Sequence, residues 1–193
     1  IQSIYVTTNG SLPDRVESFA KEITAYDPNM ELTFQISIDD MPERHDEVRK
    51  IKGLFKNCIE TYNKLKKINN VSPVVSITVT QENCDNIEKI FNFLHYDSKI
   101  DSIKCTLVRD EGVYKTPADK KNKILEAYNW LTNTIEKLSN NKSLINYNSE
   151  SLQGRLHRKK DYISWKMIKE MYITPKYLSM CYAGKLFGII TAN

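Results

Sequence analysis

The chain has 193 residues, of which 40% are hydrophobic and 27% charged, and its formal net charge is +4. This length suffices for one core of moderate size and the start of a second unit. The sequence shows no signal peptide and no apolar stretch of about 18 residues, so we expect no membrane association. The four cysteines, Cys58, Cys84, Cys105 and Cys181, lack paired spacing. Their spacing disfavours a disulfide framework or a zinc knuckle and favours a reducing, cytoplasmic setting.

Strands and helices alternate along the first two thirds of the chain. Period-2 patterns predict strands over residues 2–8, 31–38, 73–80 and 100–108. Helical spacing predicts helices from Ser11, over about residues 44–68 with an interruption at Gly53, from Asp85, and after Pro117. Alternation of this kind implies a parallel sheet with right-handed crossovers, and ligands of such sheets bind at the carboxyl ends of the strands.

The predicted strand over residues 31–38 has two different faces. Leu32, Phe34, Ile36 and Ile38 form one face, while Thr33, Gln35, Ser37 and Asp39 form the other. A strand of a parallel sheet is normally apolar on both faces. A polar inner face recurs at Ser76, Thr78 and Thr80. The pattern favours a barrel-like sheet that holds a ligand, with Ser37 and Asp39 at its rim.

Composition changes near residue 140. The segment from Ser139 to Leu156 is rich in Asn and Ser and is interpreted as a linker, followed by a short helix over about residues 161–172. We divide the chain into a partial barrel (1–138), a linker and helical segment (139–177), and the start of a small second domain (178–193). The basic run over residues 155–160 is interpreted as a solvated surface stretch, and no nucleic-acid motif surrounds it.

Asp39 has two interpretations that spacing alone leaves about even. A carboxylate at a strand end accepts hydrogen bonds from a ribose diol in dinucleotide sites, and Ser37 lies on the same face. The alternative is a helix-capping pair with Asp40. For His45-Asp46 a metal role is disfavoured, because adjacent helical residues point about 100° apart. A helix-start role is favoured for Asp46.

Several short motifs, taken in order, resemble the radical SAM superfamily, specifically members with a C-terminal SPASM or twitch extension. They are Thr8-Asn9-Gly10, Ser37-Ile38-Asp39-Asp40, His45-Asp46-x-x-Arg49 with Gly53-x-Phe55, Thr78-Val79-Thr80-x-x-Asn83, and Cys181-x-Ala183-Gly184. The resemblance implies a partial (β/α)6 TIM-like barrel with about four βα units. It also implies an enzyme that reductively cleaves S-adenosylmethionine, using a 4Fe–4S cluster, to a 5′-deoxyadenosyl radical for hydrogen abstraction.

The resemblance also implies roles for particular residues. Asn9, Ser37 and Asp39 match cofactor-binding positions, and Cys181 matches the first ligand of an auxiliary 4Fe–4S cluster. The Cys-x-x-x-Cys-x-x-Cys loop of the family is missing from this sequence. We therefore expect this chain to be the middle of a longer enzyme and inactive by itself, with the main-cluster ligands elsewhere.

The substrate is left open, a peptide or protein being one candidate, and the full-length enzyme would need a reductant such as flavodoxin or ferredoxin. Two other functions also remain open at this point. One is a non-radical (β/α) barrel enzyme, which would need a Schiff-base lysine or a phosphate loop at a strand end. The other is a non-catalytic α/β binding domain.

Overall fold

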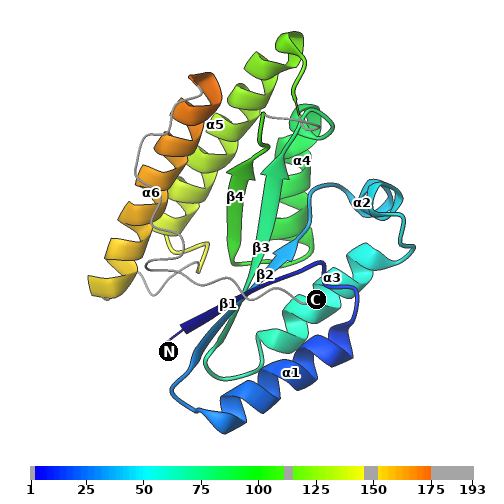
Figure 1. Ribbon diagram of the computed structural model, residues 1–193, viewed down its shortest axis with the longest axis vertical. Coiled ribbons are helices and arrows are strands. Elements are labelled where there is room, and N and C mark those ends of the chain that lie inside the picture. Colours follow the sequence, from blue (N-terminus) through cyan, green and yellow to red (C-terminus); the bar gives the residue numbers. More distant parts are fainter. Residues whose placement is uncertain (1–2, 111–114, 146–151, 175–193) are drawn as a thin grey trace.

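The computed structural model describes residues 3–110, 115–145 and 152–174. Within them, four parallel strands form one sheet in the order β1-β2-β3-β4. The elements in chain order are β1 (Ser3–Thr8), α1 (Pro13–Tyr26), β2 (Glu31–Ser37), α2 (Pro42–Arg49), α3 (Leu54–Leu65), β3 (Val71–Val79), η1 (Cys84–Asn86), α4 (Ile87–Asn92), η2 (Phe93–Asp97), β4 (Ile103–Leu107), α5 (Ala118–Asn140) and α6 (Leu152–Ile173). The predicted α/β class and the parallel sheet are confirmed (Figure 1).

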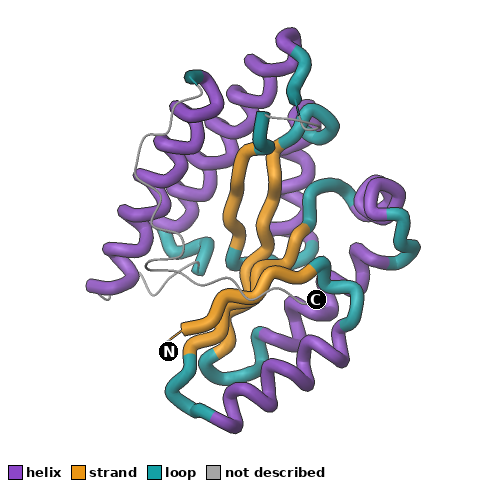
Figure 2. The backbone as a smooth tube through the Cα atoms, viewed as in Figure 1, coloured by secondary structure: helices purple, strands orange, loops and turns teal. Residues whose placement is uncertain are grey.

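The sheet is strongly twisted, so that β1 and β2 run obliquely to the upper part of β3 and to β4 (Figure 2). The register aligns Thr8 with Ile36 and Ser37 with Ser76 across successive strands. All four strands run in the same direction, so their carboxyl ends lie along one edge. The loops that follow β2 and β3 therefore come together there, which is the arrangement that a partial barrel requires.

The core lies between the apolar face of the sheet and the helices. The strand residues predicted to face the helices are almost fully buried: Leu32, Phe34, Ile36, Ile38, Val75, Ile77 and Val79. The helix α3 adds Leu54, Cys58, Tyr62 and Leu65 to the same cluster. On the opposite face of the sheet Thr33, Gln35 and Ser37 are only half-buried. The predicted difference between the two faces of β2 is thus confirmed.

The predicted break at Gly53 is confirmed, and it separates α2 from α3. Lys50 and Gly53 both have positive φ angles, +57° and +79°. The left-handed conformation ends a helix and lets the chain turn. The helix predicted from Ser11 begins two residues later, since α1 starts at Pro13 and has no side-chain cap. The Ser11 hydroxyl instead donates to Asn9 Oδ1 at 2.8 Å.

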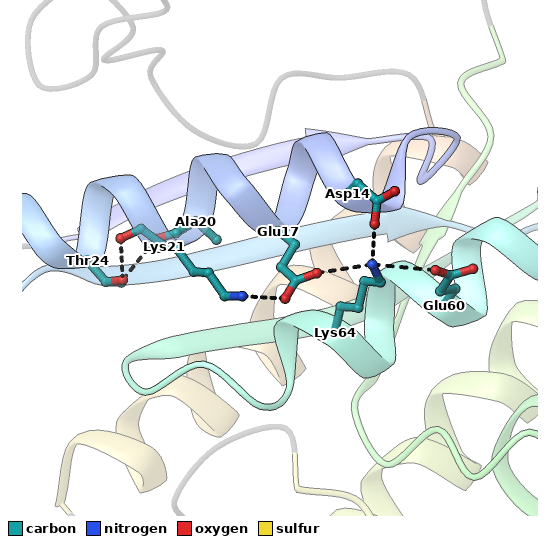
Figure 3. A network of polar contacts seen from close by, with 7 residues as sticks. All are labelled: Asp14, Glu17, Ala20, Lys21, Thr24, Glu60 and Lys64. Atoms are coloured by element: carbon teal, nitrogen blue, oxygen red, sulfur yellow. Dashed lines mark hydrogen bonds and ion pairs between the residues drawn. The ribbon is translucent and has the colours of Figure 1, made fainter.

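Lys64 of α3 joins α3 to α1 (Figure 3). Its ammonium group lies close to Asp14 and 3.1 Å from Glu17, both on α1, and 3.5 Å from Glu60 on its own helix. Lys21 contacts the same Glu17 at 2.6 Å. These pairs are near the surface, where water screens them. They therefore orient the two helices more than they stabilise them.

The helix α6 is longer than the sequence suggested. It begins by Leu152 rather than near residue 161, so part of the expected linker is helical. It packs on α5 and β4. The hydroxyl of Tyr128 on α5 donates a hydrogen bond to the backbone oxygen of Trp165 on α6 at 3.5 Å, and Tyr172 of α6 is buried. The proposed division of the chain near residue 138 stays a prediction. Its last part, residues 178–193 with Cys181, lies outside the described residues.

Candidate functional site

A polar cavity of about 690 Å³ lies at the carboxyl ends of β2 and β3. Its lining comes from the end of β3, from residues that follow β2, β3 and β4, from α2, and from residues just before α5. The lining residues are Asp39, Asp40, His45, Val48, Arg49, Thr78, Thr80, Gln81, Glu82, Asn83, Val108, Lys115 and Thr116. This is the edge at which ligands of parallel sheets bind, so the cavity is the candidate site.

Asp39 makes contacts with several elements around this cavity. One oxygen of its carboxylate accepts a hydrogen bond from the Thr78 backbone N–H at 2.8 Å. The other pairs with the Arg49 guanidinium at 2.6 Å, and both side chains remain partly open to solvent. The carboxylate thus connects β2, α2 and β3. It makes no helix cap, so the capping interpretation of Asp39 is wrong. The Asp40 carboxylate accepts a hydrogen bond from the Met41 N–H at 2.8 Å.

Asn83 links the loops that follow β2 and β3. Its side-chain amide donates to the Asp39 carbonyl at 2.7 Å and to the Thr78 carbonyl at 2.8 Å. Its side-chain oxygen accepts the Thr80 N–H at 2.8 Å. The residue is 2% exposed. Three satisfied bonds in a buried position give both loops one defined geometry.

His45 and Asp46 serve different purposes. His45 is buried beside Phe55, and its Nδ1 lies 3.5 Å from the Asp39 backbone nitrogen. Burial lowers the pKa of its imidazole from the ordinary value. Asp46 accepts hydrogen bonds from the backbone N–H groups of Gly53 and Phe55 at the start of α3. The bond from Phe55 is the main cause that lowers the pKa of this carboxyl. The helix-start role expected of Asp46 is thus confirmed, although it concerns the following helix.

The turn at Asn9-Gly10 is held against α3. Cys58 donates its thiol proton to the Asn9 carbonyl at 3.0 Å, and Thr61 donates to the Gly10 carbonyl at 3.1 Å. A Cβ on Gly10 would lie 3.0 Å from the Cys58 Cα, and the φ angle of Gly10 is +69°. Only glycine fits both conditions without strain. Sequence patterns do not reveal this contact, because Cys58 and Asn9 are 49 positions apart in the chain.

The structure brings only part of the predicted cofactor-binding set together. Asp39 lines the cavity, whereas Asn9 and Ser37 are not among its lining residues. Asn9 is exposed, and its side-chain oxygen accepts from the Ser11 N–H at 3.1 Å. Ser37 ends β2 on the polar face and is half-buried. The sequence analysis assigned no role to Lys115 and Thr116, because they follow a loop with no pattern that places them.

The described cysteines do not fit an iron–sulfur cluster. Cys58, Cys84 and Cys105 are each buried as free thiols. Burial raises the pKa of Cys58 to about 12, and the pKa of the other two is also raised by burial. Among residues 3–110, 115–145 and 152–174, no cluster of three or more His, Cys, Asp or Glu side chains is arranged to hold a metal ion.

The cavity does suit S-adenosylmethionine in size and charge. Small-ligand sites have volumes of roughly 300–1,000 Å³, and this cavity lies within that range. Its lining has three acids (Asp39, Asp40 and Glu82) and two cations (Arg49 and Lys115). S-adenosylmethionine carries a sulfonium, an ammonium and a carboxylate, so its net charge is positive. The excess of acidic side chains complements that charge.

Comparison with known proteins gives two informative matches, while no family model matches the chain. The chain is 32% identical over 92 residues to the sporulation killing factor maturation protein SkfB of Bacillus subtilis (strain 168). That match covers 44% of this chain and 22% of SkfB. The solved structure of native anSMEcpe with bound AdoMet superposes with a TM-score of 0.51 at 18% identity.

The structural match covers 72% of this chain and 38% of the solved one. The chain spans about a fifth of the curated relative's length and well under half of the solved chain. At this level of identity the structural likeness concerns the fold alone. Each helix within the described ranges is too short or too polar to cross a lipid bilayer.

Proposed function

We propose that this chain is the middle part of a radical SAM enzyme and that its cavity binds S-adenosylmethionine. The observation that carries the proposal is the acidic cavity at the carboxyl ends of β2 and β3. Its position, its volume and its charge all suit the cofactor. The resemblance of the motifs and the two matches point in the same direction.

The side chains of this cavity would bind and orient the cofactor. The Asp39 carboxylate, fixed by Thr78 and Arg49, has lone pairs left to accept hydrogen bonds from ribose hydroxyls. Ser37 and Asn9 would contact the same cofactor from the adjoining polar face and strand-end turn. The ion pair holds Arg49 beside Asp39, so the guanidinium offsets part of the negative charge and limits repulsion of the cofactor carboxylate.

A 4Fe–4S cluster supplies the electron for cofactor cleavage in such enzymes. Its ligands would lie in segments outside this chain, which accords with the much greater length of both matched proteins. Cys181 is proposed as the first ligand of an auxiliary cluster in a SPASM or twitch extension. A peptide or protein substrate, a flavodoxin or ferredoxin as reductant and a cytoplasmic location complete the proposal.

A non-radical barrel enzyme with a Schiff-base lysine is less well supported. Lys104 is a half-buried lysine of β4, and burial lowers its pKa. It is the second residue of β4 and lies 3.9 Å from Asp161 of α6. It therefore lies near the strand's amino end, away from the cavity. Such enzymes place the lysine at the carboxyl end instead.

The proposal is tested with the full-length enzyme of which this chain is the proposed middle part. The enzyme is reconstituted anaerobically with iron and sulfide and then reduced with dithionite. Incubation with S-adenosylmethionine should release 5′-deoxyadenosine, quantified by liquid chromatography and mass spectrometry. Unreduced protein is the matched control and should release none. If the reduced, cluster-loaded protein also releases none, the proposed activity is wrong.

A further inference from the structure

The basic run over residues 155–160 contributes side chains to a cavity. Arg155, Arg158 and Lys159 line a second cavity of about 250 Å³ between α5 and α6. The two helices lie side by side at the edge of the sheet, beyond β4 (Figure 1). The helix α5 returns antiparallel to β4, so its last turn lies at the amino end of the sheet. This cavity is therefore remote from the candidate site.

The charges around this second cavity are unequal. Three cations face two acids, Glu136 and Asp161. Asp161 already pairs with Lys160 at 3.3 Å and lies 3.9 Å from Lys104. Arg158 is oriented by a bond of 3.3 Å to Asn140 Oδ1 at the end of α5. The cavity thus presents a positive excess in which guanidinium groups match the planar, bidentate geometry of carboxylates.

The size and the aromatic lining of this cavity restrict what it can bind. A volume of about 250 Å³ is below the roughly 300–1,000 Å³ of small-molecule sites, so it suits one or two side chains. Tyr162 and Trp165 form part of the lining. Aromatic and arginine side chains together are the residues that contribute most at peptide interfaces.

An exposed apolar row runs along α6 beside the cavity. Leu152, Leu156 and Ile163 are 67%, 61% and 56% exposed. They share one helical face, since they are spaced by four and seven residues. Lys159 lies three residues after Leu156 and four before Ile163, so it connects this row to the cavity. A ligand on this surface would meet cations and apolar side chains together.

We propose that this surface of α5 and α6 binds an acidic peptide segment that also carries apolar side chains. Its carboxylates would pair with Arg155, Arg158 and Lys159, and its apolar side chains would cover Leu156 and Ile163. Nucleic acid is disfavoured because a phosphate backbone would gain nothing from the apolar row. The inference does not depend on the proposed function, because it concerns the other end of the sheet.

The test measures fluorescence anisotropy of a short fluorescein-labelled peptide that repeats Glu-Glu-Leu, titrated with the intact protein. The matched peptide repeats Gln-Gln-Leu and keeps the apolar side chains. The double variant R155Q/K159Q changes exposed side chains, so folding should be unaffected. It should weaken binding of the acidic peptide by about tenfold or more, the effect expected for charge-assisted hydrogen bonds.

The charge-matched control is K52Q/K56Q, which removes two exposed cations elsewhere on the molecule. It should leave the affinity unchanged, and the Gln-Gln-Leu peptide should bind much more weakly than the acidic one. Absence of peptide binding, equal losses in both double variants, or equal affinity for both peptides would overturn the proposal. So would duplex DNA or phosphatidylglycerol vesicles that displace the acidic peptide more efficiently than unlabelled peptide does.

Discussion

Asn83 donates a hydrogen bond from its side chain to the backbone oxygen of Asp39, across a separation of 44 residues and a distance of 2.7 Å. This bond joins the loop after β2 to the loop after β3. In addition, the Asp39 carboxylate accepts a hydrogen bond from the Thr78 backbone N–H. These two hydrogen bonds hold the loops together, so the candidate cavity is formed without a bound ligand.

Replacement of Asn83 by Ala should lower the free energy of unfolding by about 1–3 kcal/mol. The reason is that partly buried backbone groups of Asp39, Thr78 and Thr80 lose their partner. Urea denaturation followed by circular dichroism measures the change. The control is Gln81→Ala, an exposed position of the same loop, which should change stability little. Equal effects of the two substitutions would show that Asn83 does not hold the loops.

Gly10 and Gly53 form a natural pair for comparing conformational strain with steric overlap. Both have positive φ, yet a Cβ on Gly10 would meet Cys58 and Ile36 within 3.2 Å, whereas a Cβ on Gly53 would meet nothing within 4 Å. Gly53→Ala should cost only the backbone strain, roughly 1–2 kcal/mol. Gly10→Ala should cost more in the same denaturation assay. If Gly10→Ala costs no more than Gly53→Ala, then the close packing of the Asn9-Gly10 turn on α3 is wrong.

His45 should make stability depend on pH in the weakly acidic range. Burial lowers its folded-state pKa below the ordinary value of 6.5. As the pH falls through 6.5 the unfolded chain therefore binds a proton more readily than the folded one, and stability decreases. The variant His45→Gln lacks this group, and its stability should fall less steeply from pH 7.5 to about pH 5.5. Parallel slopes for the two proteins would contradict a neutral, buried His45.

Asp46 should also make stability fall as the pH falls, but in a more acidic range than His45. Its folded-state pKa lies below the ordinary value of 3.8, chiefly because of the hydrogen bond from Phe55. Its contribution is therefore present above that value and is lost as the pH falls through the folded-state pKa. Asp46→Asn should be less stable than the natural protein at neutral pH, and the difference should shrink in strong acid. Urea midpoints at both pH values measure it, and a constant difference would refute the capping role.

Periodicity predicted the local features of this fold well. The alternation from Leu32 to Ile38 gave the correct buried face, because side-chain direction in a strand follows from position alone. The break at Gly53 was visible because a glycine interrupts an apolar stripe. The helix α6 was underestimated, since polar residues before residue 161 gave no apolar stripe to mark its start.

Contacts between distant segments could not be predicted in the same way. The bonds from Asn83 to Asp39 and from Cys58 to Asn9 depend on how the strands twist and how α3 packs. Asn9, Ser37 and Asp39 appeared equivalent in sequence, as polar residues at strand ends. The structure separates them, because only Asp39 reaches the cavity. Strand-end polarity placed all three residues at one edge of the sheet, but it could not show which of them lines the cavity.

The most direct test of the proposed cofactor site is calorimetric titration of S-adenosylmethionine into the intact protein and its Asp39→Ala variant. The natural protein should bind the cofactor, and the variant should lose roughly 1–3 kcal/mol of binding free energy, the cost of a lost polar contact. Glu22→Ala, an exposed carboxylate on α1, is the matched control and should bind normally. Unchanged affinity in a folded Asp39→Ala protein, or no binding by the natural protein, would contradict the assignment of this cavity.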